Sequence, residues 1–319
     1  MTEREDYHAK ILRVLIRMER DIDRAWTLEE LASIASFSPY HFHRVFTSMV
    51  GEPVATYLRR IRLEAAAGQL SGTTLPVSEI GASYGYENPE VFSRAFAKRF
   101  GISPSRFREI ASDIESLDRS ESGELAWRVA ARWRAMLPAD DGSEVDAEIV
   151  RMPTIRCAFV RAFGPYAKSG PGAWRGLGKW AKKHGIPLDT RQRFSVSHDD
   201  PAVADERRLR LDACVEILDD ESDLASGPVC ITDVRAGEYA RLVHPGHIST
   251  IGRTFSRAYG RWLPASGREL RAAPALLQHI GPRTLTGPSK RTAVLLPLRS
   301  RTSRVCVSDD IDTPHKGAD

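Results

Sequence analysis

An internal repeat of 50 residues is the feature that most constrains the fold of this chain. The identical pairs that a shift of 50 positions superposes include Ala32 and Ala82, Pro39 and Pro89, Phe42 and Phe92, Arg44 and Arg94, Phe46 and Phe96, and Gly51 and Gly101. In each copy a short helix and a tight turn precede a helix whose two Phe residues, four positions apart, would pack on the first helix. The repeat therefore predicts an all-α domain with two helix-turn-helix motifs.

Helix start signals support this prediction. Pro39, Pro89 and Pro104 each follow a Ser or Asn, which combines a capping side chain with Pro at the first helical position. Thr27 precedes Glu30 by three residues, the spacing of a capping box. Apolar residues at helical spacing predict one earlier amphipathic helix: Ile11, Val14, Leu15, Met18 and Ile22.

The sequence changes character between Ser112 and Glu124, where SDIESLDRSESGE is polar and lacks apolar periodicity. We expect these divisions: a helical domain at 1–111, a linker at 112–124, a second domain at 125–307 and a disordered tail at 308–319. Apolar runs typical of strands follow the linker: Ile155–Val160, Leu209–Leu218, Val229–Val234, Tyr239–Val243 and Ala293–Leu298. Helical stretches ending near Trp180 and Trp262 lie between them, so the fold class is multidomain, all-α followed by α+β.

A second repeat, with a shift of 82 residues, relates two parts of the second domain. Its identical pairs include Gly164 and Gly246, Trp180 and Trp262, and Gly185 and Gly267. These matches indicate two related halves, each with a strand, a turn that contains Gly and a helix. A cleft between two such halves is a natural small-molecule site.

Composition excludes several classes of protein. The 319 residues carry 46 Lys and Arg against 42 Asp and Glu, and this net charge of +4 is too small to indicate a nucleic-acid binder by itself. No apolar run approaches the roughly 18 residues of a membrane span. The start MTEREDYHAK lacks the apolar core of a secretory signal. We therefore expect a cytoplasmic protein without a membrane partner.

The four cysteines, Cys157, Cys214, Cys230 and Cys306, are far apart in the sequence. They form no C-x-x-C pair, and no histidine lies at ligand spacing from them. Buried, inert thiols are therefore expected, with no metal site and no cofactor.

Basic residues cluster although the total charge is nearly balanced. The first cluster, interrupted only by Glu52, comprises Arg44, Arg59, Arg60 and Arg62. The second, which has no acid before Glu109, comprises Arg94, Lys98, Arg99, Arg106 and Arg108. Such clusters are an electrostatic footprint for phosphates. For Arg60 and Lys98, a solvated helix face is an equally good interpretation.

Two runs in the first domain carry a family resemblance. They are LEELASIASFSPYHFHRVFTSMVGEPVATYLRRIRLEAA and VSEIGASYGYENPEVFSRAFAKRFGISPSRFR. They resemble the DNA-binding domain of the AraC/XylS family of bacterial transcription regulators, over residues 5 to 111. The resemblance implies two recognition helices, starting at Pro39 and Pro89, joined by a long helix from about Val54 to Leu70. Such readers could enter successive major grooves, about 34 Å apart.

The resemblance implies a set of DNA-binding residues on these helices. They are Tyr40, His43 and Arg44, their counterparts Glu90, Ser93 and Arg94, and Arg59 and Arg62 on the long helix. Arg44 and Arg94 are the best candidates for base contacts, because Arg can bridge O6 and N7 of guanine. Phosphate anchoring is the alternative role for both.

The second domain, from about Asp146 to Leu298, resembles the GyrI-like effector-binding domain. The matching runs are FGPYAKSGPGAWRGLGKWAKKHGI, VSHDDPAVADERRLRLDACVEI, GEYARLVHPGHISTIGRTFSRAYGRWLPASG and TAVLLPLR. The resemblance implies a cleft lined by aromatic residues, and commonly by a buried acid, that binds small amphipathic molecules. This sequence departs from the family pattern at Leu277, where an acid is common.

The effector-binding candidates are Tyr166, Trp174, Trp180, Glu216, Tyr259 and Trp262. Packed core is the alternative role for Trp180 and Trp262, because a Trp at the end of an amphipathic helix is more often core. Glu216 would alternate to the strand face opposite Ala213 and Val215, where a solvated position is its alternative. Without an acid at Leu277, the main reason to expect a cationic ligand is absent.

The sequence thus favours a ligand-responsive transcription regulator. Its partners would be double-stranded DNA and a small, amphipathic or aromatic effector, with RNA polymerase as a further candidate. Two alternatives remain: a GyrI-like small-molecule hydrolase, and a ligand-sequestering protein with a vestigial DNA-binding half. We expect no enzymatic activity, because no constellation of catalytic residues stands out.

Overall fold

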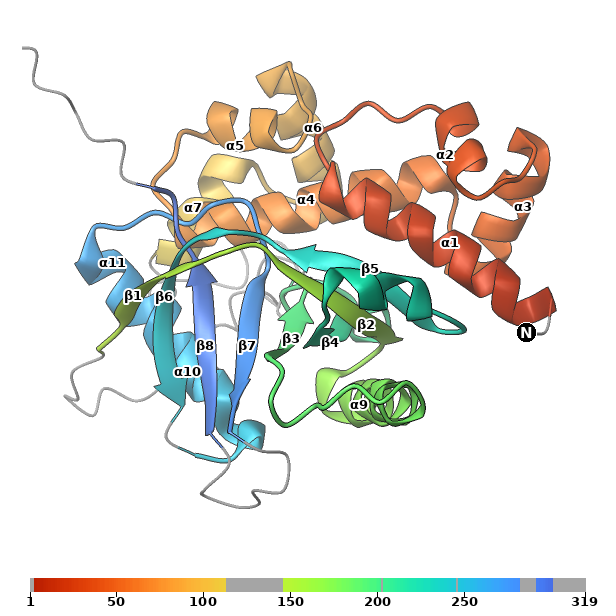
Figure 1. Cartoon of the computed structure of the whole chain (residues 1–319). Helices are drawn as coiled ribbons and strands as arrows, with labels where there is room; N and C mark the ends of the chain where they lie inside the picture. The colour runs from red at the N-terminus through yellow and green to blue at the C-terminus, as the bar shows by residue number, and fades with distance from the viewer. Residues whose placement is uncertain (1–2, 113–145, 202, 245, 282–290, 301–319) are drawn as a thin grey trace, which may run out of the picture.

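The structure, a computed structural model, describes residues 3–112, 146–201, 203–244, 246–281 and 291–300. Seven helices at the N-terminal end pack above one large sheet (Figure 1). The predicted linker after Ser112 and the predicted tail lie outside the described residues. Strand-rich structure begins at Glu148, so the all-α and α+β parts follow each other as the sequence predicted.

The helical part contains the repeat as two similar units. Its helices are α1 (Glu3–Arg20), α2 (Leu28–Ile34), α3 (Pro39–Val50), α4 (Val54–Gly72), α5 (Val77–Ser83), α6 (Pro89–Phe100) and α7 (Pro104–Ser112). The first unit is α2 with α3, and the second is α5 with α6. The long helix α4 lies between them in the sequence and supplies residues to both cores.

Local signals place the ends of these helices. The capping box is confirmed: Oγ1 of Thr27 accepts a hydrogen bond from the Glu30 amide at 3.2 Å, and the Glu30 carboxylate accepts one from the Thr27 amide at 3.0 Å. α3 and α6 begin at Pro39 and Pro89, as predicted. Both end at a left-handed glycine, Gly51 with φ 81° and Gly101 with φ 83°.

Each unit has its own aromatic core. Phe42 and Phe46 are fully buried with residues of α1, α2 and α4. The matching Phe92 and Phe96 are fully buried in a second cluster with α4, α5 and α7. The predicted anchoring role of the Phe pairs is thus confirmed in both copies.

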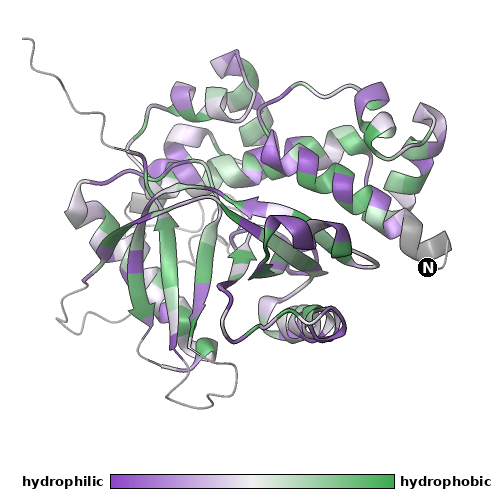
Figure 2. Cartoon of the chain, in the orientation of Figure 1, coloured by the Kyte–Doolittle hydropathy of each residue, from purple (hydrophilic) through white to green (hydrophobic). Residues whose placement is uncertain are grey.

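The C-terminal part is an antiparallel sheet of eight strands. They are β1 (Glu148–Met152), β2 (Ile155–Phe163), β3 (Arg193–Ser197), β4 (Arg210–Glu216), β5 (Val229–Val234), β6 (Gly237–His244), β7 (Ala275–Ile280) and β8 (Arg291–Pro297), in the spatial order β1-β6-β8-β7-β3-β4-β2-β5. Helix α9 (Tyr166–Lys183) follows β2. Helices α10 (Ile251–Arg257) and α11 (Leu263–Ser266) follow β6, joined by a π-helical turn. Figure 2 shows apolar residues along the central strands β7 and β8.

The strand order confirms two related halves. β1, β2, α9, β3 and β4 form one half, and β5, β6, α10 with α11, β7 and β8 form the other. β1 pairs with β6, and β5 pairs with β2, so each half lends its first strand to the other. β3 and β7, which start at Arg193 and Ala275, pair where the halves meet.

The two faces of the sheet meet different partners. On β2 and β4, the paired residues Val160 and Ala213 lie on the face that packs against α9. Their neighbours Phe159 and Cys214 lie on the opposite face, in a cluster that Leu12 and Ile16 of α1 adjoin. The helical domain and α9 therefore cover opposite faces of the same strands.

Three of the four cysteines lie in the described residues, and all three are buried free thiols. Burial raises the pKa of Cys157 to about 12 and that of Cys230 to about 11. Cys306 lies outside the described residues. In the part of the chain that the structure describes, no group of His, Cys, Asp and Glu is arranged to hold a metal ion, and no helix is long and apolar enough to cross a membrane.

Candidate DNA interface and effector site

The two candidate recognition helices present matching outward faces. On α3, Tyr40 is 74% exposed, and His43 and Arg44 are exposed beside it. On α6, Glu90 and Arg94 are exposed and Ser93 is half-buried. The buried Phe pairs force this arrangement, because the residues between them on a helix must face elsewhere.

One outward residue escaped the sequence interpretation. Val91, in the first turn of α6, is 44% exposed. An apolar side chain at this place can contact a thymine methyl group. Tyr40 occupies the first turn of α3, and the guanidinium of Arg44 lies 5.7 Å from the centre of its ring.

The basic clusters divide into exposed and internally paired members. The exposed members are Arg44, Arg59, Arg94, Lys98 and Arg106, and of these Arg106 also contacts Glu109 of its own helix at 3.0 Å. Arg62 instead donates from Nε to the backbone oxygen of Ile22 at 2.6 Å and from Nη2 to that of Arg24 at 2.8 Å. The structure therefore gives Arg62 a role in holding the turn after α1, which its sequence context did not indicate.

Arg60 and Arg99 are engaged with carboxylates of their own domain. Arg60 contacts Glu52 at 2.8 Å and Glu64 at 2.9 Å, and Arg99 reaches the other oxygen of Glu64 at 2.9 Å. Arg208, from the second domain, also contacts Glu52, at 2.7 Å. The solvated-face interpretation of Arg60 is wrong, because its side chain is only 13% exposed within this network.

Trp174 of α9 packs against the apolar cluster between α9 and the sheet and also contacts polar side chains of two strands. Its indole Nε1 donates to Oγ of Ser195 on β3 at 3.1 Å, and Nε2 of His279 on β7 lies 2.9 Å from the same hydroxyl. The rings of Trp174 and His279 meet edge to face at 5.0 Å. Ser195 pairs with Leu277 in the strand register, so these groups surround the position where the family commonly has an acid.

The remaining aromatic candidates are dispersed. Trp180 is buried in the core under α9, and its Nε1 donates to the backbone oxygen of Leu224 at 3.0 Å. Trp262 is half-buried against the core of the other half. Tyr259 is 37% exposed and stacks on Phe255 with ring centres 6.3 Å apart. Trp174 adjoins the same buried cluster as Trp180, whereas Trp262 adjoins the cluster of the other half.

Tyr166 and Glu216 belong to other surroundings. The Tyr166 hydroxyl donates to the backbone oxygen of Asp199 at 2.6 Å, and burial raises its pKa above the ordinary value. Glu216 lies on the face opposite Ala213 and Val215, as its alternation predicted, and accepts a hydrogen bond from the Gln192 amide at 3.0 Å. Glu216 therefore lies on the other side of the sheet from Trp174.

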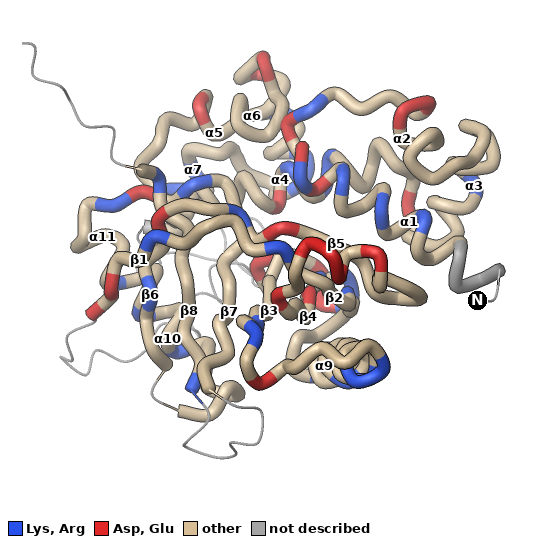
Figure 3. Tube along the Cα trace, viewed as in Figure 1, with Lys and Arg blue, Asp and Glu red and all other residues tan. Residues whose placement is uncertain are grey.

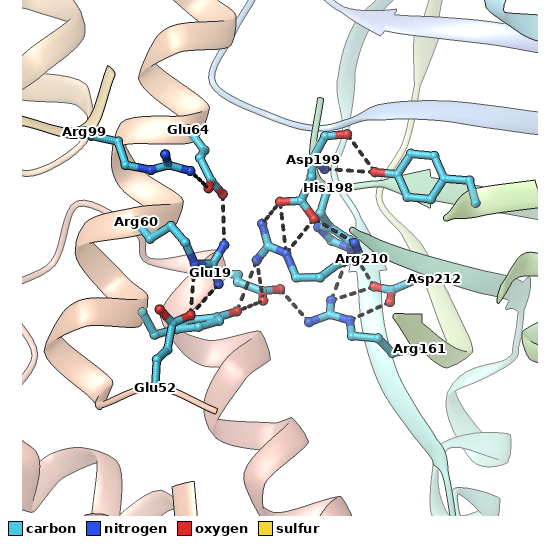
Figure 4. Close-up of polar contacts among 12 residues, drawn as sticks. Glu19, Glu52, Arg60, Glu64, Arg99, Arg161, His198, Asp199, Arg210 and Asp212 are labelled. Carbon is cyan, nitrogen blue, oxygen red and sulfur yellow. Dashed lines mark hydrogen bonds and ion pairs between the residues drawn. The ribbon is translucent and has the colours of Figure 1, made fainter. Parts of the chain in front are cut away.

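A buried polar network joins the two domains (Figure 4). Arg161 of β2 and Arg210 of β4 both reach Glu19 of α1, at 2.7 and 2.6 Å. The hydroxyl of Tyr57 on α4 donates to Glu19 at 2.6 Å. Burial alone would raise the pKa of Glu19, but the two arginines outweigh it and lower the pKa to about 2. Figure 3 shows charges of both signs where α1 and α4 face the sheet.

Sequence comparisons identify the helical part. A profile described as a helix-turn-helix domain matches residues 31–110. The HTH-type transcriptional activator AarP of Providencia stuartii is 33% identical over 98 residues, and the match covers 31% of this chain and 73% of AarP. The chain belongs to the AraC/XylS family. The two units of this AraC-type domain are α2 with α3 and α5 with α6.

The same comparisons identify the second domain of this AraC/XylS-family chain. A profile of the GyrI-like small molecule binding domain matches residues 146–287.

A further relative is named as an HTH-type regulator. The RCS-specific HTH-type transcriptional activator RclR of Escherichia coli is 37% identical over 102 residues, or 32% of this chain. The chain spans only about a third of RclR, 36% of its length.

Solved structures show similar parts. The cryo-EM structure of the EcmrR–DNA complex in EcmrR-RPo covers 85% of this chain and 98% of its own, with 13% identity and a TM-score of 0.41. The C-terminal domain of AraT from Geobacillus stearothermophilus is 31% identical and covers 34% of this chain and 92% of its own, with a TM-score of 0.32.

Proposed function

We propose that this protein is a ligand-responsive, sequence-specific transcription regulator that reads an asymmetric DNA site with two recognition helices of one chain. The observation that carries this proposal is the exposure of both helices. Tyr40, Arg44, Glu90 and Arg94 are exposed although the second domain is docked on α1 and α4. The proposed domain bounds remain 1–111, 112–124 and 125–307, and the cytoplasm, where bacterial DNA lies, is the proposed location.

Arg44 and Arg94 are the proposed base readers, supported by Tyr40, His43, Glu90 and Ser93. Arg59 is the proposed phosphate contact on α4, because it is the exposed arginine of that helix. Arg62 stays a weaker proposal, since two of its donors are used inside the domain.

DNase footprinting of the full-length protein upstream of its own and neighbouring genes tests the proposal. At low salt we expect the protein to protect an asymmetric site. Arg94→Ala should weaken specific binding to that site by about 1–3 kcal/mol. Arg175→Ala, an exposed arginine on α9, is the matched control and should bind normally. Absence of any protected site would contradict DNA reading, and equal losses on specific and random DNA would reduce Arg94 to a phosphate contact.

We further propose that the effector is a small aromatic or amphipathic molecule without a required positive charge, bound beside Trp174. Support comes from the Trp174, Ser195 and His279 group around Leu277, which offers hydrogen bonds and a ring but no carboxylate. Tryptophan fluorescence should respond to neutral aromatic compounds at least as strongly as to matched amines. Trp174→Phe should remove that response, whereas Trp180→Phe should retain it.

The proposal includes no catalytic step. Relatives named as transcription regulators support this view, and a hydrolase or a sequestering protein is the alternative. Incubation of the full chain with reactive cyclic esters should give no turnover above buffer. RNA polymerase is a proposed partner, to be tested by transcription from a footprinted promoter with and without the protein.

A further inference from the structure

Two arginines of the sheet form a preorganised receptor for a carboxylate. Arg161 donates from Nε and Nη2 to the two oxygens of Asp212, at 2.7 and 2.8 Å. Arg210 donates from Nε and Nη2 to Asp199. Each arginine therefore has its fork fixed within the sheet domain, and each still has Nη1 available to bind an anion.

The helical domain supplies that anion. Nη1 of Arg161 contacts Oε2 of Glu19 at 2.7 Å, and Nη1 of Arg210 contacts Oε1 at 2.6 Å (Figure 4). The side chains are shielded from water: Arg161 is 2% exposed, Arg210 6% and Glu19 10%. If Glu19 withdraws, both arginines keep their own aspartates, so the contact can open without breaking the ion pairs of the sheet.

Glu19 and Tyr57 distinguish the first copy of the repeat from the second. Glu19 and Tyr57 correspond, by the shift of 50, to Gln69 and Phe107. Tyr57 packs edge-on against Phe46 at 5.8 Å, and Phe107 packs edge-on against Phe96 at 5.3 Å. The ring is thus common to both copies, whereas a charge and a hydroxyl are present only in the first, where they meet the arginines.

We propose that Glu19 and Tyr57 form a latch that docks the GyrI-like domain on the first helix-turn-helix and links strands β2 and β4 to recognition helix α3. On the strand side, Val160 and Ala213 alternate with the arginine-bearing positions and pack against α9, which carries Trp174. On the helical side, Tyr57 contacts Phe46, the buried anchor of α3. A displacement of β2 and β4 caused at α9 would change the fit of Glu19 and the support of α3.

The latch adds a physical link between the domains to the proposed regulation. Only its last step, from α3 to DNA, rests on the proposed function. The docking step is tested without DNA or effector, by hydrogen exchange of the full chain. Glu19→Gln and Tyr57→Phe install the residues of the second copy, and Glu109→Gln, an exposed carboxylate on α7, is the matched control. Far-UV circular dichroism checks that each variant folds.

In Glu19→Gln, exchange should accelerate by about tenfold or more in α1, β2, β4 and α3, and it should stay within about twofold in α6. Tyr57→Phe should accelerate exchange by about threefold to tenfold in the same segments, because this substitution removes only hydrogen bonds. If Glu19→Gln does not fold, Tyr57→Phe alone decides the question.

Unchanged exchange in α3 of a folded variant would overturn the latch, and equal acceleration in α3 and α6 would overturn its link to the first copy. The step to DNA is measured separately, on a duplex selected from random sequence by the wild-type protein. Glu19→Gln should change its dissociation constant at least about threefold. A wild-type protein that selects no duplex would contradict the proposed function and leave the docking result standing.

Discussion

The two helix-turn-helix copies are alike in how their recognition helices begin, pack and end, and they differ in how they are supported. Both have a capped Pro at the start of the recognition helix, a buried Phe pair and a left-handed glycine at its end. The first copy is supported by a charged network through Glu19 and Tyr57. The second is supported by an apolar cluster that includes Phe100, Phe107 and, from the second domain, Val203. Its Glu79 also forms a partly exposed ion pair with Arg299 of the second domain at 2.8 Å.

This difference separates two ways of attaching a neighbouring domain. An apolar contact such as that of Val203 is non-directional and stabilises in proportion to buried area. A buried ion pair is costly to form but strongly directional, and small displacements weaken it. Small movements of the sheet should therefore affect the contact through Glu19 more than the contact through Val203.

The largest expected effect compares the aromatic cores of the two copies. Phe96→Ala and Phe46→Ala should each lower the free energy of unfolding by about 3–5 kcal/mol. Phe96 should lie at the upper end, because its ring meets Phe92, Phe100 and Phe107, whereas Phe46 meets two rings. Urea denaturation measures both losses. Leu218 is 53% exposed, so Leu218→Ala is a control that should cost less than about 0.5 kcal/mol. A greater loss for Phe46→Ala would break the comparison.

Acid should weaken the first copy through Glu19. The arginines lower its pKa from 4.5 to about 2 against the opposing effect of burial, so the ionised form stabilises the folded state. This contribution, about 3 kcal/mol, is complete well above pH 4.5 and is lost as the pH falls towards 2, with about 2 kcal/mol gone by pH 3.

Urea denaturation at pH 7 and pH 3 checks the sign. The difference in stability between wild type and Glu19→Gln should shrink by about 2 kcal/mol at the lower pH. A difference that is independent of pH would show that Glu19 is not ionised in the folded protein. Gln69→Ala, at the equivalent position in the second copy, should cost the same at both pH values.

The sequence predicted the helical domain well because its signals are local. Capping residues, Pro at the first helical position and Phe spacing act within one turn or two, and α3 and α6 begin where these signals lie. Strands β1, β3 and β7 were missed. β1 is a short edge strand with little burial. β3 does alternate polar and apolar residues over Arg193–Ser197, a strand signal that the sequence interpretation overlooked, although every residue of Arg193–Val196 is buried.

The candidate site was predicted only in part, for the same reason. The outward residues of α3 and α6 follow from helical geometry, whereas Ser195 and His279 join Trp174 only through strand pairing. The latch was missed because Glu19 and Arg210 are 191 residues apart, and a charge on an amphipathic helix is usually solvated. The repeat held a signal that could have found it, because Glu19 and Tyr57 depart from Gln69 and Phe107.

A smaller effect tests the shared backbone of the two copies. Gly51→Ala and Gly101→Ala place a Cβ at φ 81° and φ 83°, which strains the backbone by about 1–2 kcal/mol. An added Cβ would meet no atom within 4 Å at either position, so packing does not distinguish the two glycines. Thermal denaturation should give equal losses, and losses that differ by more than about 1 kcal/mol would show that the turns are not equivalent.

The smallest expected effect concerns the N-caps of α3 and α6, which differ by one hydrogen bond. Oδ1 of Asn88 accepts from the Glu90 amide at 2.8 Å and the Val91 amide at 3.4 Å, whereas Oγ of Ser38 accepts only from the His41 amide at 3.4 Å. Asn88→Ala should therefore cost about 1 kcal/mol and Ser38→Ala about 0.5 kcal/mol. Hydrogen exchange of the first turns of α3 and α6 measures both. Because a cap acts locally, each loss should appear in its own helix, and a Ser38→Ala variant that also loosens β2 and β4 would show that α3 and the sheet are coupled from the helix side.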